Sequence, residues 1–464
     1  MVSDQQRNAV DNMSHKRHAA VLAFPFGCHA KPVLNLVCKL AKAAPDTRFS
    51  FINTSKSNNS LFQNSKSENL ENIIPYNVSY GVPTNHVLTG NPLEAVDLFL
   101  KAAPKNFKTC IEKAIEDATM QISCLITDGF LVFGSQMADD FGVPWIPIWI
   151  PLPCTLSAHI YTDTIRHLYI NDGVNGQVKT LEAIPSLSTM RIEDLPDEVL
   201  PSESLFSETL RQIGKVLPQS AVVVMNFYQE LNPTVLENDL KSKSVKLLNV
   251  GFLTLSLPLP PLPLSESDAT GCLSWLDDQQ ASSVVYISFG TVGVPSRSEL
   301  VALAEALEAI DAPFLWSLRG SFKDLLPNDF VERVNKNGRV VSWVPQTQVL
   351  RHSSIGVFVT HCGCNSVYES ITNGVPMICR PLFGDHRMTG RMVEEVWGVG
   401  VKVEGGVITK NGIIKNFKLI LEDDKGKEVR EKARALKEIV KEAAGPSGSA
   451  IQDFNTLVDI ISLL

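Results

Sequence analysis

The sequence predicts an α/β protein built from two βαβ domains. The chain has 464 residues, which is more than a single hydrophobic core usually serves. In both halves, short apolar runs alternate with longer segments of helical periodicity, as in proteins with parallel sheets. A proline-rich stretch separates the two halves. Length, alternation and this break therefore indicate two domains, each with its own parallel sheet.

The expected strands are short apolar runs rich in Val and Ile. Their apolar residues do not alternate with polar ones, which is typical of strands buried on both faces of a sheet. Because a segment with helical spacing follows each run, we expect repeated βαβ units. In the first half the runs cover residues 19–24, 49–52, 124–127, 145–148 and 221–225. In the second half they cover residues 284–289, 314–318, 339–341, 355–360, 377–379 and 399–401.

A linker is expected over residues 251–270, where Leu alternates with Pro before the chain turns polar. Proline fixes φ and removes a backbone donor, so this stretch can form neither a helix nor an inner strand. A proline-rich recognition motif is the alternative, but sheet patterns on both sides favour a linker. The expected domains are then residues 1–250 and 271–445. A last helix within residues 446–464 is expected to return to the first domain.

Charge and composition exclude several classes of protein. The chain carries 42 Lys and Arg against 50 Asp and Glu, a net charge of -8, so we expect no nucleic-acid partner. Its hydrophobic content of 44% argues against intrinsic disorder. No apolar run reaches the roughly 18 residues of a spanning helix, and the polar start is unlike an export signal, so we expect no membrane partner. Nine scattered cysteines favour a reducing compartment, and we expect a cytoplasmic monomer.

The segment 343–386 carries the densest group of candidate binding residues. An expected strand over residues 355–360 ends in the turn 361–366, which reads His-Cys-Gly-Cys-Asn-Ser, and a helix follows. Backbone N–H groups and the positive end of that helix converge at the turn, which predicts an anion site. Glu369, one turn into the helix, can accept hydrogen bonds from a ribose diol. Taken alone, such a turn is more often an ordinary helix N-terminus than an anion site, so the residues around it must distinguish the two interpretations.

A second group of candidates follows the first expected strand. His29 ends the turn Phe24-Pro25-Phe26-Gly27-Cys28-His29, and Asp128 ends another strand of the same predicted sheet. Open α/β sheets bind ligands at the carboxyl ends of their strands. An imidazole beside a buried carboxylate can act as a general base. A single histidine is more often a capping or core residue, so these residues alone leave the role open.

The whole segment 343–386 resembles the signature box of the plant UDP-dependent glycosyltransferases of family 1, and it has the length of that box. The resemblance extends over the chain from residues 24–27 to 453–454 and is strongest to the flavonoid 3-O-glycosyltransferase branch. It implies the GT-B fold, in which two Rossmann-like domains face across a cleft. The matching residues of the box are Trp343, Val344, Pro345, Gln346, His361, Cys362, Gly363, Asn365, Ser366, Glu369, Ser370, Gly374, Val375, Pro376, Met377, Pro381, Phe383, Gly384, Asp385 and His386.

The resemblance implies how a nucleotide sugar binds to the second half of the chain. Trp343 stacks on the uracil ring, Gln346 contacts the nucleotide, and Glu369 binds the ribose hydroxyls. The turn 361–366 holds the diphosphate, and the last two positions of the box bind the transferred sugar. UDP-galactose or UDP-glucose is the expected co-substrate, with no metal and no other cofactor. The implied donor-binding residues are Thr291, Trp343, Gln346, His361, Asn365, Ser366, Glu369, Asp385 and His386.

The same resemblance places the catalytic base at His29 and the acid that orients it at Asp128. The base takes the proton of the acceptor hydroxyl while its oxygen attacks the anomeric carbon. One direct displacement inverts the anomeric centre, and the anion site stabilises the departing diphosphate. The acceptor is a small phenolic molecule, and the implied acceptor-binding residues are Phe26, Leu93 and His159.

Three positions depart from the family pattern. His386 stands where glucosyltransferases usually have Gln, and His there is associated with UDP-galactose. Ile150 stands where relatives that use glucose often have a Thr that contacts the sugar. Cys364 replaces a Trp of the box. We therefore predict an inverting transfer of a hexose, with galactose favoured, to the 3-hydroxyl of a flavonol or anthocyanidin.

Several alternatives stay open or are disfavoured. A UDP-glucose-dependent flavonoid 3-O-glucosyltransferase, or a glucosyltransferase for another small plant metabolite, fits the same scaffold. A dinucleotide oxidoreductase is disfavoured because no Gly-x-Gly-x-x-Gly pattern follows the first strand. A binding protein without catalysis is disfavoured because both His29 and Asp128 are retained.

Overall fold

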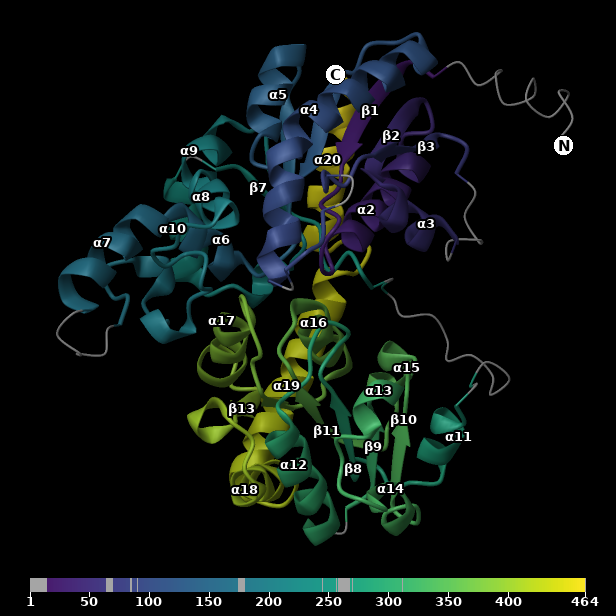
Figure 1. Ribbon diagram of the computed structural model, residues 1–464, viewed down its shortest axis with the longest axis vertical. Helices are drawn as coiled ribbons and strands as arrows, with labels where there is room; N and C mark the ends of the chain where they lie inside the picture. Colours follow the sequence, from purple (N-terminus) through teal and green to yellow (C-terminus); the bar gives the residue numbers. More distant parts are fainter. Residues whose placement is uncertain are drawn as a thin grey trace, which may run out of the picture.

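The computed structural model describes residues 15–63, 70–83, 86–89, 91–173, 180–243, 245–255, 257, 268, 270–310 and 312–463. These residues form two α/β domains, one above the other in Figure 1. Most of the expected linker, including the stretch 258–267, lies outside the described residues.

The first domain is built around a sheet of seven described strands, all parallel. Their order is β3-β2-β1-β4-β5-β6-β7, so the chain reverses its direction of growth between β1 and β4. Ligands bind at such a switch point in open α/β sheets. The strands are β1 (Arg17–Leu22), β2 (Thr47–Thr54), β3 (Ile73–Val78), β4 (Cys124–Asp128), β5 (Trp145–Trp149), β6 (Val223–Met225) and β7 (Leu247–Asn249).

Two of these strands were missing from the sequence prediction, and both lie at the edges of the sheet. β3 contains Pro75, and its buried and exposed residues partly alternate, because one of its sides faces no further strand. β7 is only three residues long and ends in the polar Asn249. Continuous apolar runs identify inner strands, which are buried on both faces. Edge strands such as β3 and β7 lack such runs, so this criterion does not detect them.

Helices cover both faces of the first sheet. α2 (Ala30–Ala43) packs on one face together with the C-terminal helix, and α4 (Pro92–Ala118) packs on the other. Asn91 caps α4 by accepting a hydrogen bond from the N–H of Leu93. The remaining α-helices are α3 (Ser55–Gln63), α5 (Gly134–Phe141), α6 (Pro153–Ile160), α7 (Thr162–Gly173), α8 (Leu205–Arg211), α9 (Ile213–Val216) and α10 (Thr234–Ser242).

The second domain repeats this plan with six described parallel strands in the order β10-β9-β8-β11-β12-β13. The strands are β8 (Val284–Ser288), β9 (Phe314–Ser317), β10 (Gly338–Val341), β11 (Ile355–Thr360), β12 (Met377–Cys379) and β13 (Gly400–Lys402). Its helices are α11 (Cys272–Asp277), α12 (Arg297–Ile310), α13 (Gly320–Lys323), α14 (Phe330–Arg333), α15 (Gln346–Arg351), α16 (Cys364–Asn373), α17 (His386–Arg391), α18 (Lys410–Leu421) and α19 (Asp424–Ala443). Each expected strand of this half corresponds to an observed one.

The two domains are joined by aromatic packing and by a buried ion pair. Phe252, which follows β7, stacks on Tyr368 of α16 with ring centroids 4.1 Å apart. Nε of Arg391 donates to Oδ2 of Asp194 over 2.8 Å, and both side chains are almost fully buried. Both contacts join a residue of the first domain to a helix of the second, so the boundary between the domains is packed with apolar and paired charged groups.

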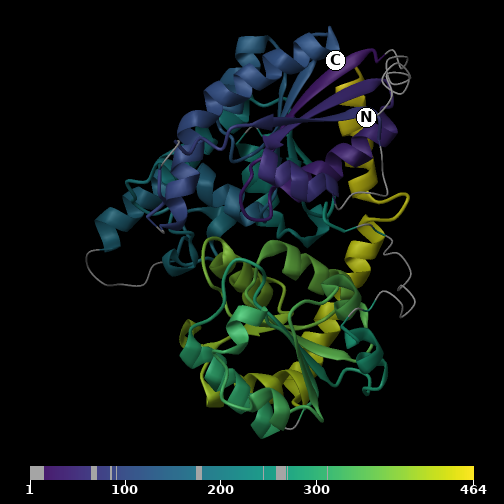
Figure 2. The ribbon, with the colours of Figure 1, turned by 45° about the vertical axis from the view of Figure 1, so that its right-hand side comes forward.

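The C-terminal helix α20 (Ser449–Leu463) lies against the first domain, although it follows the second in sequence. The N–H of Asn249 donates to the carboxylate of Asp453 over 2.6 Å, and Leu457 and Ile461 are buried in the core of the first sheet. Figure 2 shows this helix running up along the first domain. Among the described residues, no helix combines the length and apolar character needed to cross a lipid bilayer.

Candidate active site

His29 and Asp128 form a buried, hydrogen-bonded pair at the carboxyl edge of the first sheet. His29 directly precedes α2, while Asp128 is the last residue of β4, the strand beside β1. Nδ1 of His29 and Oδ2 of Asp128 are 2.9 Å apart, and the other carboxylate oxygen accepts from the N–H of Phe130. Because a carboxylate only accepts, Nδ1–H is the donor, and Nε2 is the nitrogen that can exchange a proton with a substrate.

The charge of Asp128 sets the proton affinity of this imidazole. Burial lowers the pKa of His29, but the negative charge and the hydrogen bond of Asp128 outweigh burial and raise it to about 9. His29 is therefore a strong base that gives up its own proton only as the pH approaches that value. Such a group is suited to remove a proton from a hydroxyl group held against it.

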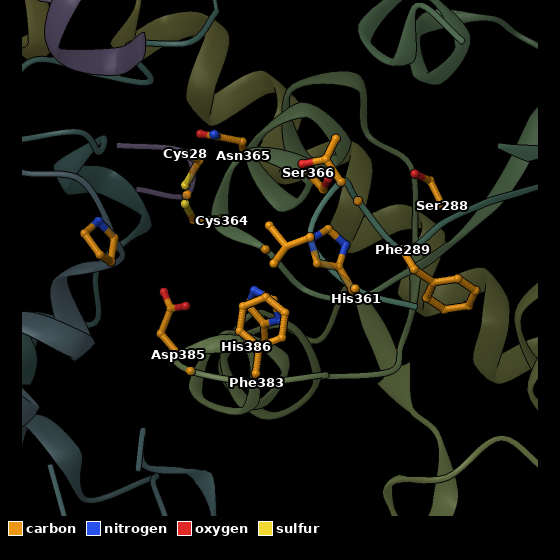
Figure 3. Close-up of a pocket in the computed structure, with 18 of the residues that line it drawn as sticks. Cys28, Ser288, Phe289, His361, Cys364, Asn365, Ser366, Phe383, Asp385 and His386 are labelled. Atoms are coloured by element: carbon orange, nitrogen blue, oxygen red, sulfur yellow. The ribbon is translucent and has the colours of Figure 1, made fainter. Parts of the chain in front are cut away.

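A cavity of about 510 Å³ lies between the two domains, a size that suits a small-molecule ligand. His29 and His159 line it from the first domain. From the second domain it is lined by most of the residues predicted to bind a nucleotide sugar, and Figure 3 shows several of them around a common space. These residues are Thr291, Trp343, Gln346, His361, Asn365, Ser366, Asp385 and His386.

The remaining predicted residues are not part of the described lining. Asp128 and Glu369 lie one layer behind it, each hydrogen-bonded to a residue that does line the cavity. Phe26 packs on Phe99 with ring centroids 5.5 Å apart. Leu93 is exposed to solvent near the start of α4. The structure therefore brings the catalytic and donor-binding candidates together, and it places Phe26 and Leu93 outside that group.

The turn between β11 and α16 leaves backbone donors free for an anion. α16 begins at Cys364, and no described side chain caps it at Gly363. Cys362 has a φ of 67°, a left-handed conformation that is costly for a residue with a Cβ and is common at functional sites. A Cβ on Gly290 would lie 2.7 Å from the His361 ring, so glycine is needed for the β8 loop to approach this turn. Free N–H groups and the positive end of α16 thus meet at the cavity.

Two histidines beside this turn are held in their neutral form. Burial lowers the pKa of His361 to about 4, and burial together with His361 lowers the pKa of His386 to about 3. Their rings meet edge to face with centroids 4.9 Å apart. A neutral imidazole donates a hydrogen bond without carrying charge. Neither histidine therefore adds positive charge at this turn, where the backbone N–H groups and the positive end of α16 face the cavity.

Polar side chains behind the turn form a connected network. Nε2 of Gln346 donates to Oγ of Ser366 over 2.9 Å and to Glu369 over 2.5 Å, and Thr347 donates to the other carboxylate oxygen of Glu369 over 2.7 Å. Burial raises the pKa of Glu369. Trp343, just after β10, is 63% exposed at the cavity rim. The exposed indole of Trp343 can stack on a nucleobase, and the carboxylate of Glu369 can accept hydrogen bonds from ribose hydroxyls, so the two together suit a nucleoside.

Asp385 and His159 are two further titratable residues that line the cavity, Asp385 from the second domain and His159 from the first. Burial raises the pKa of Asp385 to about 6, although the nearby His29 lowers it. His159 is buried against Trp149 and Phe130, with ring centroids 5.6 and 6.1 Å away, and burial lowers its pKa to about 3. Nδ1 of His159 is buried and has no hydrogen-bond partner among the described residues. Such a group can hydrogen-bond to a ligand hydroxyl.

Some lining residues were missed by the sequence prediction. Phe130 contacts His29 with ring centroids 4.5 Å apart, and its position just after a strand end was the signal that could have identified it. Glu198 and Arg319 line the cavity from loops. Loops show no hydrophobic periodicity, so nothing in the local sequence marks these residues.

A family model described as UDP-glucoronosyl and UDP-glucosyl transferase matches residues 48–441, which is most of the chain. The chain belongs to the UDP-glycosyltransferase family. An anthocyanidin 3-O-glucosyltransferase of Fragaria ananassa is 48% identical over 453 residues, covering 96% of this chain and 97% of the relative. An anthocyanidin 3-O-galactosyltransferase of Actinidia chinensis var. chinensis is 47% identical and covers 98% and 99%.

A solved structure confirms the architecture of this UDP-glycosyltransferase. A UDP-glucose: anthocyanidin 3-O-glucosyltransferase in complex with UDP superposes with a TM-score of 0.91 at 47% identity, covering 97% of this chain and 100% of that one. The predicted GT-B fold, with two Rossmann-like domains, is therefore correct. The enzyme is a glycosyltransferase with a UDP-sugar as co-substrate. Within the described ranges, no three His, Cys, Asp or Glu side chains are grouped so that they could hold a metal ion.

Proposed function

We infer that this UDP-glycosyltransferase transfers a hexose, with galactose favoured, to the 3-hydroxyl of a flavonol or anthocyanidin, with inversion at the anomeric carbon. The observation that carries the proposal is the position of the His29–Asp128 pair, which faces the uncapped end of α16 across one cavity. The relatives described above support a flavonoid as the acceptor, since they act on anthocyanidins at the 3-hydroxyl.

In this proposal the donor lies along the second domain. The uracil ring stacks on the exposed face of Trp343. The ribose hydroxyls donate to the Glu369 carboxylate, replacing the hydrogen bonds that Gln346 and Thr347 donate to it in this structure. The diphosphate bonds to backbone N–H groups of the turn 361–366 and to side-chain donors around it. Those side-chain donors are Thr291, His361, Asn365 and Ser366.

The reaction is a single displacement. The acceptor oxygen forms its bond to the anomeric carbon while the bond from that carbon to the diphosphate oxygen breaks. Nε2 of His29 takes the acceptor proton, and Asp128 stabilises the imidazolium that results. The charge that develops on the diphosphate is met by the backbone dipoles of α16, which are already oriented before the reaction. UDP leaves, and the attack from the opposite face inverts the anomeric centre.

The walls of the first domain support a flat aromatic acceptor. Phe130 presents an aromatic ring beside His29, and His159, packed against Phe130, presents a ring nitrogen that has no partner among the described residues. A planar polyphenol fits between such surfaces, and an oxygen next to its reacting hydroxyl can form a hydrogen bond with the ring nitrogen of His159. Phe26 would contribute through its packing in the aromatic cluster, and Leu93 through the loop that precedes α4.

Galactose is favoured by the lining beside Asp385. His386 is buried, neutral and has a ring nitrogen without a partner among the described residues, so it can bond to a sugar hydroxyl. Ile150 also lines the cavity and offers only an apolar surface, at the position where a Thr hydroxyl would bond to glucose. Transfer from UDP-glucose is the second candidate, because the Fragaria relative is named a glucosyltransferase.

A product assay tests both parts of the proposal. The purified protein is incubated with UDP-galactose or UDP-glucose and, in turn, with quercetin, kaempferol or cyanidin, and products are identified by mass spectrometry and NMR. We expect 3-O-β-galactosides as the main products. A preference for UDP-glucose would contradict the galactose assignment, and no turnover of any flavonoid would contradict the acceptor assignment. We also expect a cytoplasmic monomer, which light scattering and a fluorescent fusion would test.

A further inference from the structure

Cys28 and Cys364 face each other across the domain boundary. Cys28 lies in the turn between β1 and α2 of the first domain, and Cys364 is the first residue of α16 in the second. Figure 3 shows their sulfur atoms side by side at the edge of the cavity that both residues line. The two thiols share a hydrogen bond. None of the nine cysteines forms a disulfide in this structure.

The two thiols differ in reactivity. The hydrogen bond with Cys364 lowers the pKa of Cys28 to about 7; burial opposes this shift, and the charge of His29 assists it. The pKa of Cys364 is correspondingly raised. As a whole residue Cys28 is accessible to solvent, although its sulfur lies against Cys364, whereas Cys364 is buried. A thiol that ionises near neutral pH, placed beside a second thiol, is the arrangement found at redox-sensitive cysteines.

We propose that Cys28 and Cys364 form a reversible disulfide that ties the two domains together across the cleft and switches the transferase off. The proposal rests on two side chains from different domains, in contact, beside the base His29 and the diphosphate turn 361–366. A covalent bond at this point would hold the cleft at one width and fill space between the donor and acceptor halves of the cavity. Substrate entry and product release both require that space.

The chemistry is balanced with a peroxide as the oxidant. The Cys28 thiolate attacks one oxygen of hydrogen peroxide, the O–O bond breaks, and the departing oxygen leaves as water after taking up a proton. The sulfenic acid on Cys28 is then attacked by the Cys364 sulfur, which loses its proton. The S–O bond breaks, the S–S bond forms, and a second water leaves. The two thiols lose the two electrons that the peroxide gains, and a dithiol reductant reverses the change.

Other thiol pairs supply an internal comparison. Cys362 and Cys379 also share a hydrogen bond, but both are buried within the second domain. Burial raises the pKa of Cys362 well above its usual range, so this pair should resist oxidation in the folded protein. Cys38 lies on α2, away from the described cavity lining, and is partly buried.

The test treats the reduced, full-length enzyme with hydrogen peroxide, blocks remaining thiols with an alkylating agent, and digests it with trypsin without reduction. Trypsin does not cleave before proline, so Cys28 and Cys38 share the peptide 18–39, while Cys362, Cys364 and Cys379 share the peptide 352–387. We expect these two peptides to be linked. The link should vanish in Cys28→Ser and in Cys364→Ser, and it should persist in Cys38→Ser and Cys379→Ser.

Activity is measured on the same samples as the ratio of oxidised to reduced rate for each variant. In the parent enzyme the oxidised sample should be at least about tenfold slower than the reduced one, because the disulfide keeps the reacting groups from their working positions. Dithiothreitol should restore the full rate. In Cys364→Ser and Cys28→Ser the ratio should stay near one. Binding of UDP by calorimetry under reducing conditions shows that each variant is folded.

Three results would overturn the proposal. The first is the absence of the linked peptides at a peroxide dose that modifies Cys28. The second is an equal loss of activity in Cys364→Ser, which would point to oxidation of Cys28 alone. The third is full activity of the linked enzyme, which would remove the switch although the disulfide forms.

Discussion

Nδ1–H of His29 donates to Oδ2 of Asp128 over 2.9 Å at the point where β1 and β4 end side by side. The pair lies at the switch point of the first sheet, and His29 lines the cavity between the domains. The two residues are 99 positions apart in the chain, so only the parallel pairing of two strands brings them together.

Removing the imidazole tests this base directly. His29→Ala should lower kcat by about a hundredfold or more, which is the usual contribution of a general base. The affinity for UDP should stay unchanged, because the donor-binding candidates lie in the other domain. Steady-state kinetics and calorimetry measure the two effects. Full transfer activity in this variant would show that His29 is not the base.

Replacing the carboxylate should change the pH dependence as well as the rate. In the parent enzyme kcat/KM should rise as the pH approaches about 9, because only unprotonated His29 accepts a proton and Asp128 holds its pKa there. In Asp128→Asn the charge that raises the pKa is gone, so the rising limb should move to lower pH while the maximal rate falls. A loss of rate with an unmoved limb would mean that Asp128 only supports the fold.

Glu369 should contribute to donor binding and little to the chemical step. Glu369→Gln removes a negatively charged acceptor for the ribose hydroxyls, so the KM for the UDP-sugar should rise about tenfold with kcat nearly unchanged. Calorimetry with UDP should show the same loss. Glu404→Gln, which changes an exposed carboxylate of the same domain, is the matched control and should leave both constants unaltered. A fall in kcat alone would contradict the ribose assignment.

His386 should influence the choice of sugar. His386→Gln should lower the ratio of kcat/KM for UDP-galactose to that for UDP-glucose by about tenfold, the scale of discrimination that one hydrogen bond can supply. Ile150→Thr should change the ratio in the same direction by offering a hydroxyl group. His352→Gln is the control, since His352 bonds to Asp277 and is not part of the described lining. An unchanged ratio in both lining variants would mean that other contacts choose the sugar.

A buried ion pair should make the second domain sensitive to acid. Glu299 accepts from Arg380 over 2.6 Å and from the N–H of Ile408 over 3.0 Å, and although burial raises its pKa, these donors lower it to about 2. Its stabilising effect is full above the unfolded pKa of about 4.5 and is lost as the pH falls toward 2.

Glu299→Gln tests this pair by urea unfolding. At pH 7 the variant should lose about 3 kcal/mol of unfolding free energy, because Arg380, whose side chain is only 15% exposed, loses its charged partner. The difference from the parent should shrink as the pH is lowered from 5 to about 2.5. Glu332→Gln, at a largely exposed position of α14, should match the parent throughout. A difference that is independent of pH would refute the electrostatic origin.

Strongly patterned elements were predictable because their signal is local. Inner strands such as β8 and β11 are continuous apolar runs, since both of their faces are buried. The turn 361–366 was identifiable because a buried strand, a glycine and a helix start follow one another directly. β3 and β7 were missed, because edge strands need less apolar sequence and one contains a proline.

The sequence by itself determined the two parallel-sheet domains, the strand-turn-helix over residues 355–373 and, through a long matching segment, the transferase family. Only the tertiary structure decided that Glu198 and Arg319 line the cavity, that Phe26 and Leu93 do not, and that Cys28 meets Cys364. Periodicity and turn chemistry act over a few residues, so they can be read along the chain. Contacts across the cleft depend on how two separately folded sheets dock, and no local pattern encodes that geometry.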